Sequence, residues 1–197
     1  MSNQYSQNDE QRYIVAACLG PPGRFLDIGA WNAIDKSNTR ALFERGWTGV
    51  LVEPSSGPFQ GIQSAYRGVD GMAVINAAVV IEPGSVEMWL TDDCCSTTDW
   101  NIWKKWKNLV AFQPLKSVIA GVTLEDIFQQ YGEFEFVSID TEGSSVDLCL
   151  RLLVLGHRPR CICVEHDERV VELLGAANAA GYVCSYASGE NLVLARQ

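Results

Sequence analysis

Short apolar runs alternate with amphipathic segments along the chain, which is the pattern of an α/β protein. The predicted strands cover residues 24–29, 49–53, 72–80, 85–91, 134–139 and 159–164. The predicted helices cover residues 7–19, 58–66, 123–131, 146–153 and 170–177, with a further one around 41–42. The clearest helix begins at Thr123, where a Thr-x-x-Asp cap precedes the apolar stripe Leu124, Ile127, Phe128 and Tyr131.

The order of these elements predicts the fold class. Near-continuous apolar runs such as 159–164 indicate parallel strands covered on both faces. Alternating strands and helices then imply a single-domain, doubly wound, mostly parallel sheet, and two short strands around Ser188-Gly189 add an antiparallel C-terminal hairpin. We expect residues 1–23 to form a helix and lead-in, and 24–197 to form the domain, with an insertion or acceptor loop at about 92–113.

Composition narrows the class of protein. The 197 residues are 47% apolar and 20% charged, as in one soluble globular domain. The seven cysteines show no zinc-binding spacing, and those inside apolar runs predict buried thiols in a reducing, cytoplasmic compartment. The net charge of -9 disfavours nucleic-acid binding, and no apolar run approaches the ~20 residues of a membrane span.

The first chemical signal lies at two neighbouring strand ends. One strand runs into the turn Asp27-Ile28-Gly29-Ala30, and the next ends in Glu53. Glycine lets the backbone approach a ligand closely, and a carboxylate at the second tip can accept both hydroxyls of a ribose. The G-x-G-x-x-G spacing of a pyrophosphate cradle is missing, which favours an adenosyl ligand without phosphates over NAD or FAD. An ordinary turn beside a solvated Glu53 is the alternative.

Five sequence blocks, in order and separated by strands and helices, carry a resemblance to a known family. They are Asp27-Ile28-Gly29-Ala30, Ser37-Asn38-Thr39, Gly46-Trp47-Thr48-Gly49-Val50-Leu51-Val52-Glu53-Pro54, Ser138-Ile139-Asp140-Thr141-Glu142-Gly143-Ser144 and Cys163-Val164-Glu165-His166. Over about residues 24–196 the chain resembles the FkbM-type S-adenosylmethionine-dependent methyltransferases.

The resemblance implies a Rossmann-like class I methyltransferase fold, S-adenosylmethionine as cofactor and methyl transfer to an oxygen. In these blocks the expected cofactor-binding residues are Asp27, Gly29, Ala30, Asn38, Glu53, Pro54 and Asp140. Glu53 is expected on the ribose. The family commonly has Asn and Gly where this chain has Trp31 and Ala33, which predicts a reshaped cofactor loop or weaker cofactor binding.

Acidic residues and an imidazole follow two later strands. Asp140 and Glu142 follow one, Glu165 and His166 end the next, and neighbouring strand ends lie ~5 Å apart. Transfer to a hydroxyl is helped by a base or a cation, so we expect Asp140, His166 and Glu165 to be catalytic. The same three residues are also a candidate site for one divalent cation. A structural role for His166 and a helix-capping role for Glu142 stay open.

An irregular segment follows the predicted strand 85–91. Residues 92–99 are polar and turn-prone, typical of an acceptor loop, and vicinal Cys94 and Cys95 lack support for a redox role. Trp100, Trp103 and Trp106 would share one face of a helix. That face is either core or a lid in which Trp100 and Trp103, together with Glu142, contact the substrate.

We therefore expect an S-adenosylmethionine-dependent O-methyltransferase acting on a hydroxyl of a sugar or another small polar acceptor. Two alternatives remain open. The departures at Trp31 and Ala33 allow a catalytically silent cofactor-binding or interaction protein of the same fold. A nicotinamide-dependent oxidoreductase on the same architecture is disfavoured by the missing phosphate loop.

Overall fold

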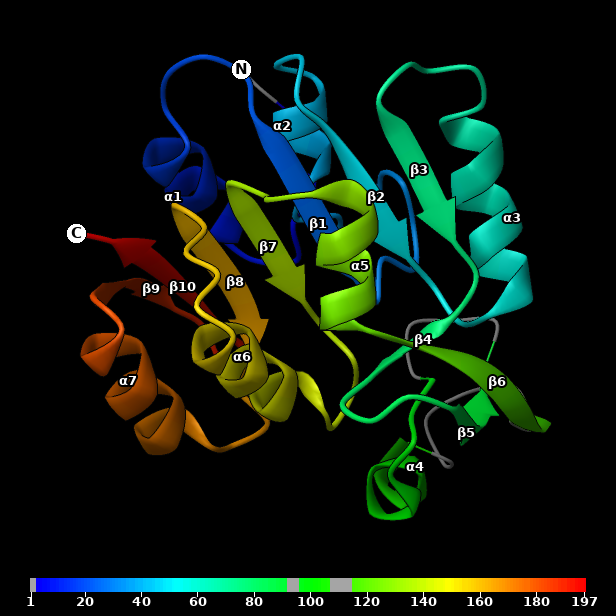
Figure 1. The fold of residues 1–197 in the computed structure, drawn as a ribbon. Coiled ribbons are helices and arrows are strands. Elements are labelled where there is room, and N and C mark those ends of the chain that lie inside the picture. Colours follow the sequence, from blue (N-terminus) through cyan, green and yellow to red (C-terminus); the bar gives the residue numbers. More distant parts are fainter. Residues whose placement is uncertain (1–2, 92–95, 107–114) are drawn as a thin grey trace.

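The computed structural model describes residues 3–91, 96–106 and 115–197. Its main sheet has seven strands in the order β3-β2-β1-β7-β8-β10-β9 (Figure 1). The strands are β1 (Arg24–Ile28), β2 (Thr48–Val52), β3 (Met72–Ile75), β7 (Phe136–Ile139), β8 (Cys161–Glu165), β9 (Tyr182–Ala187) and β10 (Asn191–Arg196). In this sheet β10 runs antiparallel to both of its neighbours, β8 and β9, and the other pairings are parallel. The mostly parallel, Rossmann-like fold and the antiparallel C-terminal hairpin are thus confirmed.

Helices cover both faces of the sheet. One face carries α1 (Glu10–Ala17), α2 (Arg40–Phe43) and α3 (Ser56–Ala65), and the other carries α5 (Leu124–Tyr131), α6 (Ser145–Val154) and α7 (Val170–Ala179). Alternate residues of β1 enter the two cores: Leu26 and Ile28 pack toward α5 and α6, whereas Phe25 packs toward α1 and α2. Burying each such side chain stabilises the fold by about 1.5–3 kcal/mol. Among the described residues, no helix is long and apolar enough to cross a bilayer.

The elements predicted best are those marked by local sequence signals. Thr123 Oγ1 accepts from the Asp126 N–H at 3.1 Å, and the Asp126 carboxylate accepts from the Thr123 N–H at 3.2 Å, so the predicted capping box is present. The first helix, expected over 7–19, is shorter and spans Glu10–Ala17. Cys149, Cys161 and Cys163 are buried as expected, and burial raises the pKa of the Cys149 thiol to about 12.

A small accessory unit lies beside the main sheet (Figure 1). It comprises a three-stranded sheet, β4 (Ala78–Val80), β6 (Leu115–Thr123) and β5 (Ser85–Leu90), and the helix α4 (Trp100–Trp106). The predicted single strand 72–80 was wrong, because β3 and β4 belong to different sheets. The extended run is interrupted at Asn76, whose side-chain amide donates to the carbonyls of Glu53 and Pro54 at 2.8 and 3.0 Å. Strand β6 was not predicted.

Candidate functional site

The turn after β1 lies between the tips of β2 and β7. Gly29 and Ala30 donate their N–H groups to the Val52 carbonyl at 3.0 and 3.2 Å. Gly29 has φ 78°, and a Cβ at this position would lie 1.7 Å from the Asp140 carbonyl oxygen. Glycine is therefore required here both by the left-handed backbone and by the close approach of the neighbouring loop.

Glu53 is fixed by the backbone around it. Its Oε2 accepts from the Trp31 N–H at 3.0 Å and its Oε1 from the Ser55 N–H at 2.7 Å. The residue is 4% exposed, and burial raises the pKa of its carboxyl. Each carboxylate oxygen has further acceptor capacity, so the group can still take hydroxyl donors from a ligand.

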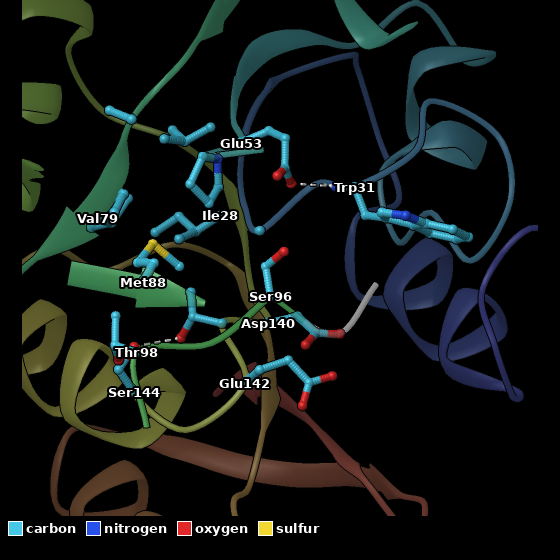
Figure 2. A pocket seen from close by; sticks show the side chains of 16 residues that line it. Ile28, Trp31, Glu53, Val79, Met88, Ser96, Thr98, Asp140, Glu142 and Ser144 are labelled. Atoms are coloured by element: carbon cyan, nitrogen blue, oxygen red, sulfur yellow. Dashed lines mark hydrogen bonds between the residues drawn. The ribbon is translucent and has the colours of Figure 1, made fainter. Parts of the chain in front are cut away.

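Trp31 adopts a left-handed backbone, with φ 42°. A bulky residue seldom does so, and the conformation directs the Trp31 N–H at Glu53. Figure 2 shows the indole pointing away from the side chains of Ile28, Val79 and Met88. The Lys36 ammonium lies 5.7 Å from the centre of the indole ring. The Trp31 side chain therefore leaves the space between those three side chains unfilled.

A cavity opens beside Glu53, at the carboxyl ends of the parallel strands (Figure 2). Its described walls are Ile28, Gly29, Trp31, Val52, Glu53, Pro54, Ala77, Ala78, Val79, Met88, Ser96, Thr98, Asp140, Thr141, Glu142 and Ser144. We call it the first cavity. It brings together four predicted cofactor residues: Gly29, Glu53, Pro54 and Asp140. Its mostly apolar walls, with a few polar groups, are typical of a small-molecule site.

A second cavity adjoins the first and shares Gly29, Trp31, Asp140 and Glu142 with it. Its other described walls are Gln7, Ala30, Lys36, Glu165, Glu190 and Asn191. Predicted Ala30 therefore lies here. We call the two adjoining cavities the groove, which is apolar at one end and acidic at the other.

Two predicted cofactor residues lie behind this groove rather than on it. Asp27 is 4% exposed and accepts from Thr39 Oγ1 at 2.6 Å. Burial raises the pKa of Asp27 to about 6, and the hydrogen bonds of Thr39 and Ser138 partly oppose that rise. Asn38 donates to Ser138 Oγ at 3.2 Å. Neither Asp27 nor Asn38 is among the described residues lining the two cavities.

The acidic end of the groove holds three carboxylates. One ligand atom from each of Asp140, Glu142 and Glu165 lies within 4.8 Å of the others. Glu165 Oε2 accepts from the Glu142 N–H and from Ser145 Oγ, both at 3.2 Å. Burial, followed by the charges of Asp140 and Glu142, raises the pKa of Glu165 far above its ordinary value. An all-oxygen donor set is suited to a hard cation such as Mg²⁺.

His166 is not part of this set. Its Nδ1 accepts from the Glu168 N–H at 3.2 Å, and it lines a third cavity together with Glu142, Glu165 and Arg169. The predicted cluster of Asp140, Glu165 and His166 therefore has Glu142 in place of the imidazole among the described residues.

The indoles of α4 form a cluster of their own. Trp100 and Trp103 stack with ring centres 4.6 Å apart, and Trp89 lies 5.2 Å from Trp100. Trp89 follows Met88 in β5 and so faces the opposite side of the small sheet. Neither Trp100 nor Trp103 is among the described residues lining the groove. Trp106, Cys94 and Cys95, which the sequence also singled out, lie outside the described side chains.

Sequence reasoning missed Met88 as a wall of the first cavity, whereas Ser96 and Thr98 lie in the segment 92–99 that it expected to be an acceptor loop. No local motif marks Met88, because its place depends on how β5 pairs with β6.

Comparison with known proteins adds little detail. No family model matches the chain, and no curated protein matches it. Among solved structures it is similar to the ribosomal protein L11 methylase of Lactobacillus delbrueckii subsp. bulgaricus, with a TM-score of 0.49 and 10% sequence identity. The match covers 95% of this chain and 77% of that one. A likeness this loose assigns no residue and no activity.

Proposed function

We propose that the protein is an S-adenosylmethionine-dependent methyltransferase that methylates a hydroxyl group of a small polar acceptor. The observation that carries the proposal is the buried Glu53 carboxylate, held at the tip of β2 by two backbone N–H groups and facing a cavity beside Gly29. A carboxylate fixed in this way is suited to accepting hydrogen bonds from the two hydroxyls of a ribose.

In this proposal the adenosine occupies the first cavity and the methionine part extends over Gly29 and Ala30 into the second. The sulfonium then faces the acidic end of the groove, where Asp140 and Glu142 belong to both cavities. The acceptor enters from the second cavity, with its hydroxyl against Asp140.

The chemistry is an in-line displacement. An oxygen lone pair of the acceptor forms the new O–C bond, the C–S bond breaks, and its electron pair leaves sulfur as a neutral thioether. The hydroxyl proton passes to a carboxylate, for which Asp140 is placed, while Glu165 positions the Glu142 backbone. Ordering the two reactants supplies much of the acceleration. Asp140, Glu142 and Glu165 would hold a divalent cation, which when bound would stabilise negative charge on the acceptor oxygen.

Calorimetry with S-adenosylmethionine and with S-adenosylhomocysteine tests cofactor binding, and release of S-adenosylhomocysteine across a panel of hydroxyl acceptors tests turnover. We expect micromolar binding of both ligands, and turnover that Asp140→Asn abolishes while binding persists. Binding without turnover over a broad panel would identify a silent cofactor-binding protein. Stabilisation by NADH but not by the methyl donor would identify an oxidoreductase instead.

A further inference from the structure

The accessory unit forms one wall of the first cavity. Val79 of β4, Met88 of β5 and the following Ser96 and Thr98 line it, opposite the β1 turn and Glu53 (Figure 2). Met88 is only 5% exposed, although it belongs to a small sheet at the side of the molecule. Its side chain is therefore enclosed by the cavity walls and the small sheet rather than by solvent.

Two consecutive residues tie this wall to both sides of the groove. Ser96 Oγ lies 2.9 Å from Ser55 Oγ, and Ser55 in turn donates its N–H to Glu53. Thr97, which is fully buried, donates its hydroxyl to the Glu142 carbonyl at 2.6 Å. The same Thr97 pairs through its backbone with Trp89, at 2.9 and 3.1 Å, so the connection is continuous with β5.

The space between this wall and β2 suits a flat apolar group. Besides Met88, it is bounded by small or aliphatic side chains, namely Ile28, Val52, Pro54, Ala77, Ala78 and Val79. A methionine thioether is flexible and polarizable and makes favourable contacts with aromatic rings. A purine base can therefore be held here by packing while its ribose reaches Glu53.

We propose that the accessory unit is part of the cofactor site, with Met88 packing against the adenine ring and Ser96 and Thr97 holding that wall in place. This assignment rests on the proposed function, since it presumes that the ligand of the first cavity is an adenosyl group. It makes Met88 a binding residue for the base, independent of the acceptor. Affinity for any ligand that contains adenosine should then depend on Met88, whether or not the methionine part is present.

Titration calorimetry with S-adenosylhomocysteine and with 5′-methylthioadenosine tests the assignment. We expect Met88→Ala to weaken both ligands by a similar factor, about 5- to 30-fold, because each loses the same apolar contact. Met88→Leu, which keeps the volume, should lose less than about 5-fold. The control is Val118→Ala, because Val118 is 67% exposed and pairs with Glu87 on the opposite face of the small sheet.

A second measurement needs no destabilising variant. The chain has three methionines, so methyl-labelled methionine gives a simple NMR spectrum in which Met88→Leu assigns the Met88 signal. Adding 5′-methylthioadenosine to the wild-type protein should shift the Met88 methyl signal upfield through the ring current of adenine and leave that of Met72 in place.

Wild-type affinity in a folded Met88→Ala variant, or an unmoved Met88 signal at saturation, would overturn the assignment while leaving the methyltransferase proposal standing. A wild-type protein that binds neither ligand would instead refute the proposed function, and this assignment with it.

Discussion

Replacing Glu53 by Gln tests the ribose contact with the smallest change of shape. In the wild type both carboxylate oxygens accept backbone N–H groups, from Trp31 at 3.0 Å and Ser55 at 2.7 Å. In the variant the amide oxygen can serve only one of these donors, and the amide nitrogen faces the other. The variant also removes a buried negative charge, and that gain offsets part of the loss in the free energy of unfolding.

The loss of ligand affinity has no such offset. A ribose hydroxyl bonded to a carboxylate gains about 1–3 kcal/mol over an unpaired one, so the dissociation constant for S-adenosylhomocysteine should rise about 5- to 150-fold. Because burial raises the pKa of Glu53, the wild-type affinity for S-adenosylhomocysteine should also fall when the pH drops below that raised pKa. The Glu53→Gln variant should lose this pH dependence. Calorimetry over a pH series measures both effects.

The matched control is Glu82→Gln, which changes an exposed carboxylate in the same way. Unchanged affinity in a folded Glu53→Gln variant would remove Glu53 from the site and refute the reasoning.

Three further predictions concern the scaffold of the site. The pKa of Asp27 is raised from 3.8 to about 6 on folding, so its protonated form favours the fold below pH 4 and this contribution disappears as pH rises through 6. Between pH 3.5 and 8, the free energy of unfolding of the wild type should therefore fall by about 3 kcal/mol relative to that of Asp27→Asn. Urea denaturation measures both proteins, and a difference between them that does not change with pH would contradict this. Gly29→Ala should lower the free energy of unfolding by about 2–5 kcal/mol, because its Cβ would meet the Asp140 carbonyl. Gly61→Ala in α3, which has open space around it, should not. Equal midpoints of the two variants in thermal unfolding would show that the turn tolerates a side chain. Thr123→Ala should lower the free energy of unfolding by about 1 kcal/mol through loss of the α5 cap, and Thr123→Ser should lower it much less. Urea denaturation measures both variants, and equal losses would exclude the hydroxyl as the cause.

The sequence predicted best what local rules determine. The period of the apolar stripe and the Thr123 cap located α5, and parallel strand ends put Gly29, Glu53 and Asp140 at one edge of the sheet. Strand β6 escaped prediction because its burial alternates weakly and its pairing with β5 joins segments about 30 residues apart. The position of Met88 in the cavity wall was not predicted either, because it depends on the same pairing.

Side-chain alternation decides which residues at the ends of the strands line the groove. Asp27 precedes the β1 turn, but it lies on the strand face shared by Phe25, opposite Leu26 and Ile28, and so reaches Thr39 instead of the groove. His166 is not in the set of Asp140, Glu142 and Glu165, although it lines a third cavity with two of them. The motifs identified the strand ends, whereas the direction of each side chain depended on the register of the strand.

A crystal structure with bound S-adenosylhomocysteine tests the central claim most directly. We predict the ribose hydroxyls within hydrogen-bond distance of the Glu53 carboxylate, the adenine in the first cavity and the thioether sulfur directed toward Asp140. A ligand bound elsewhere, or one seated in the groove with its ribose away from Glu53, would contradict it.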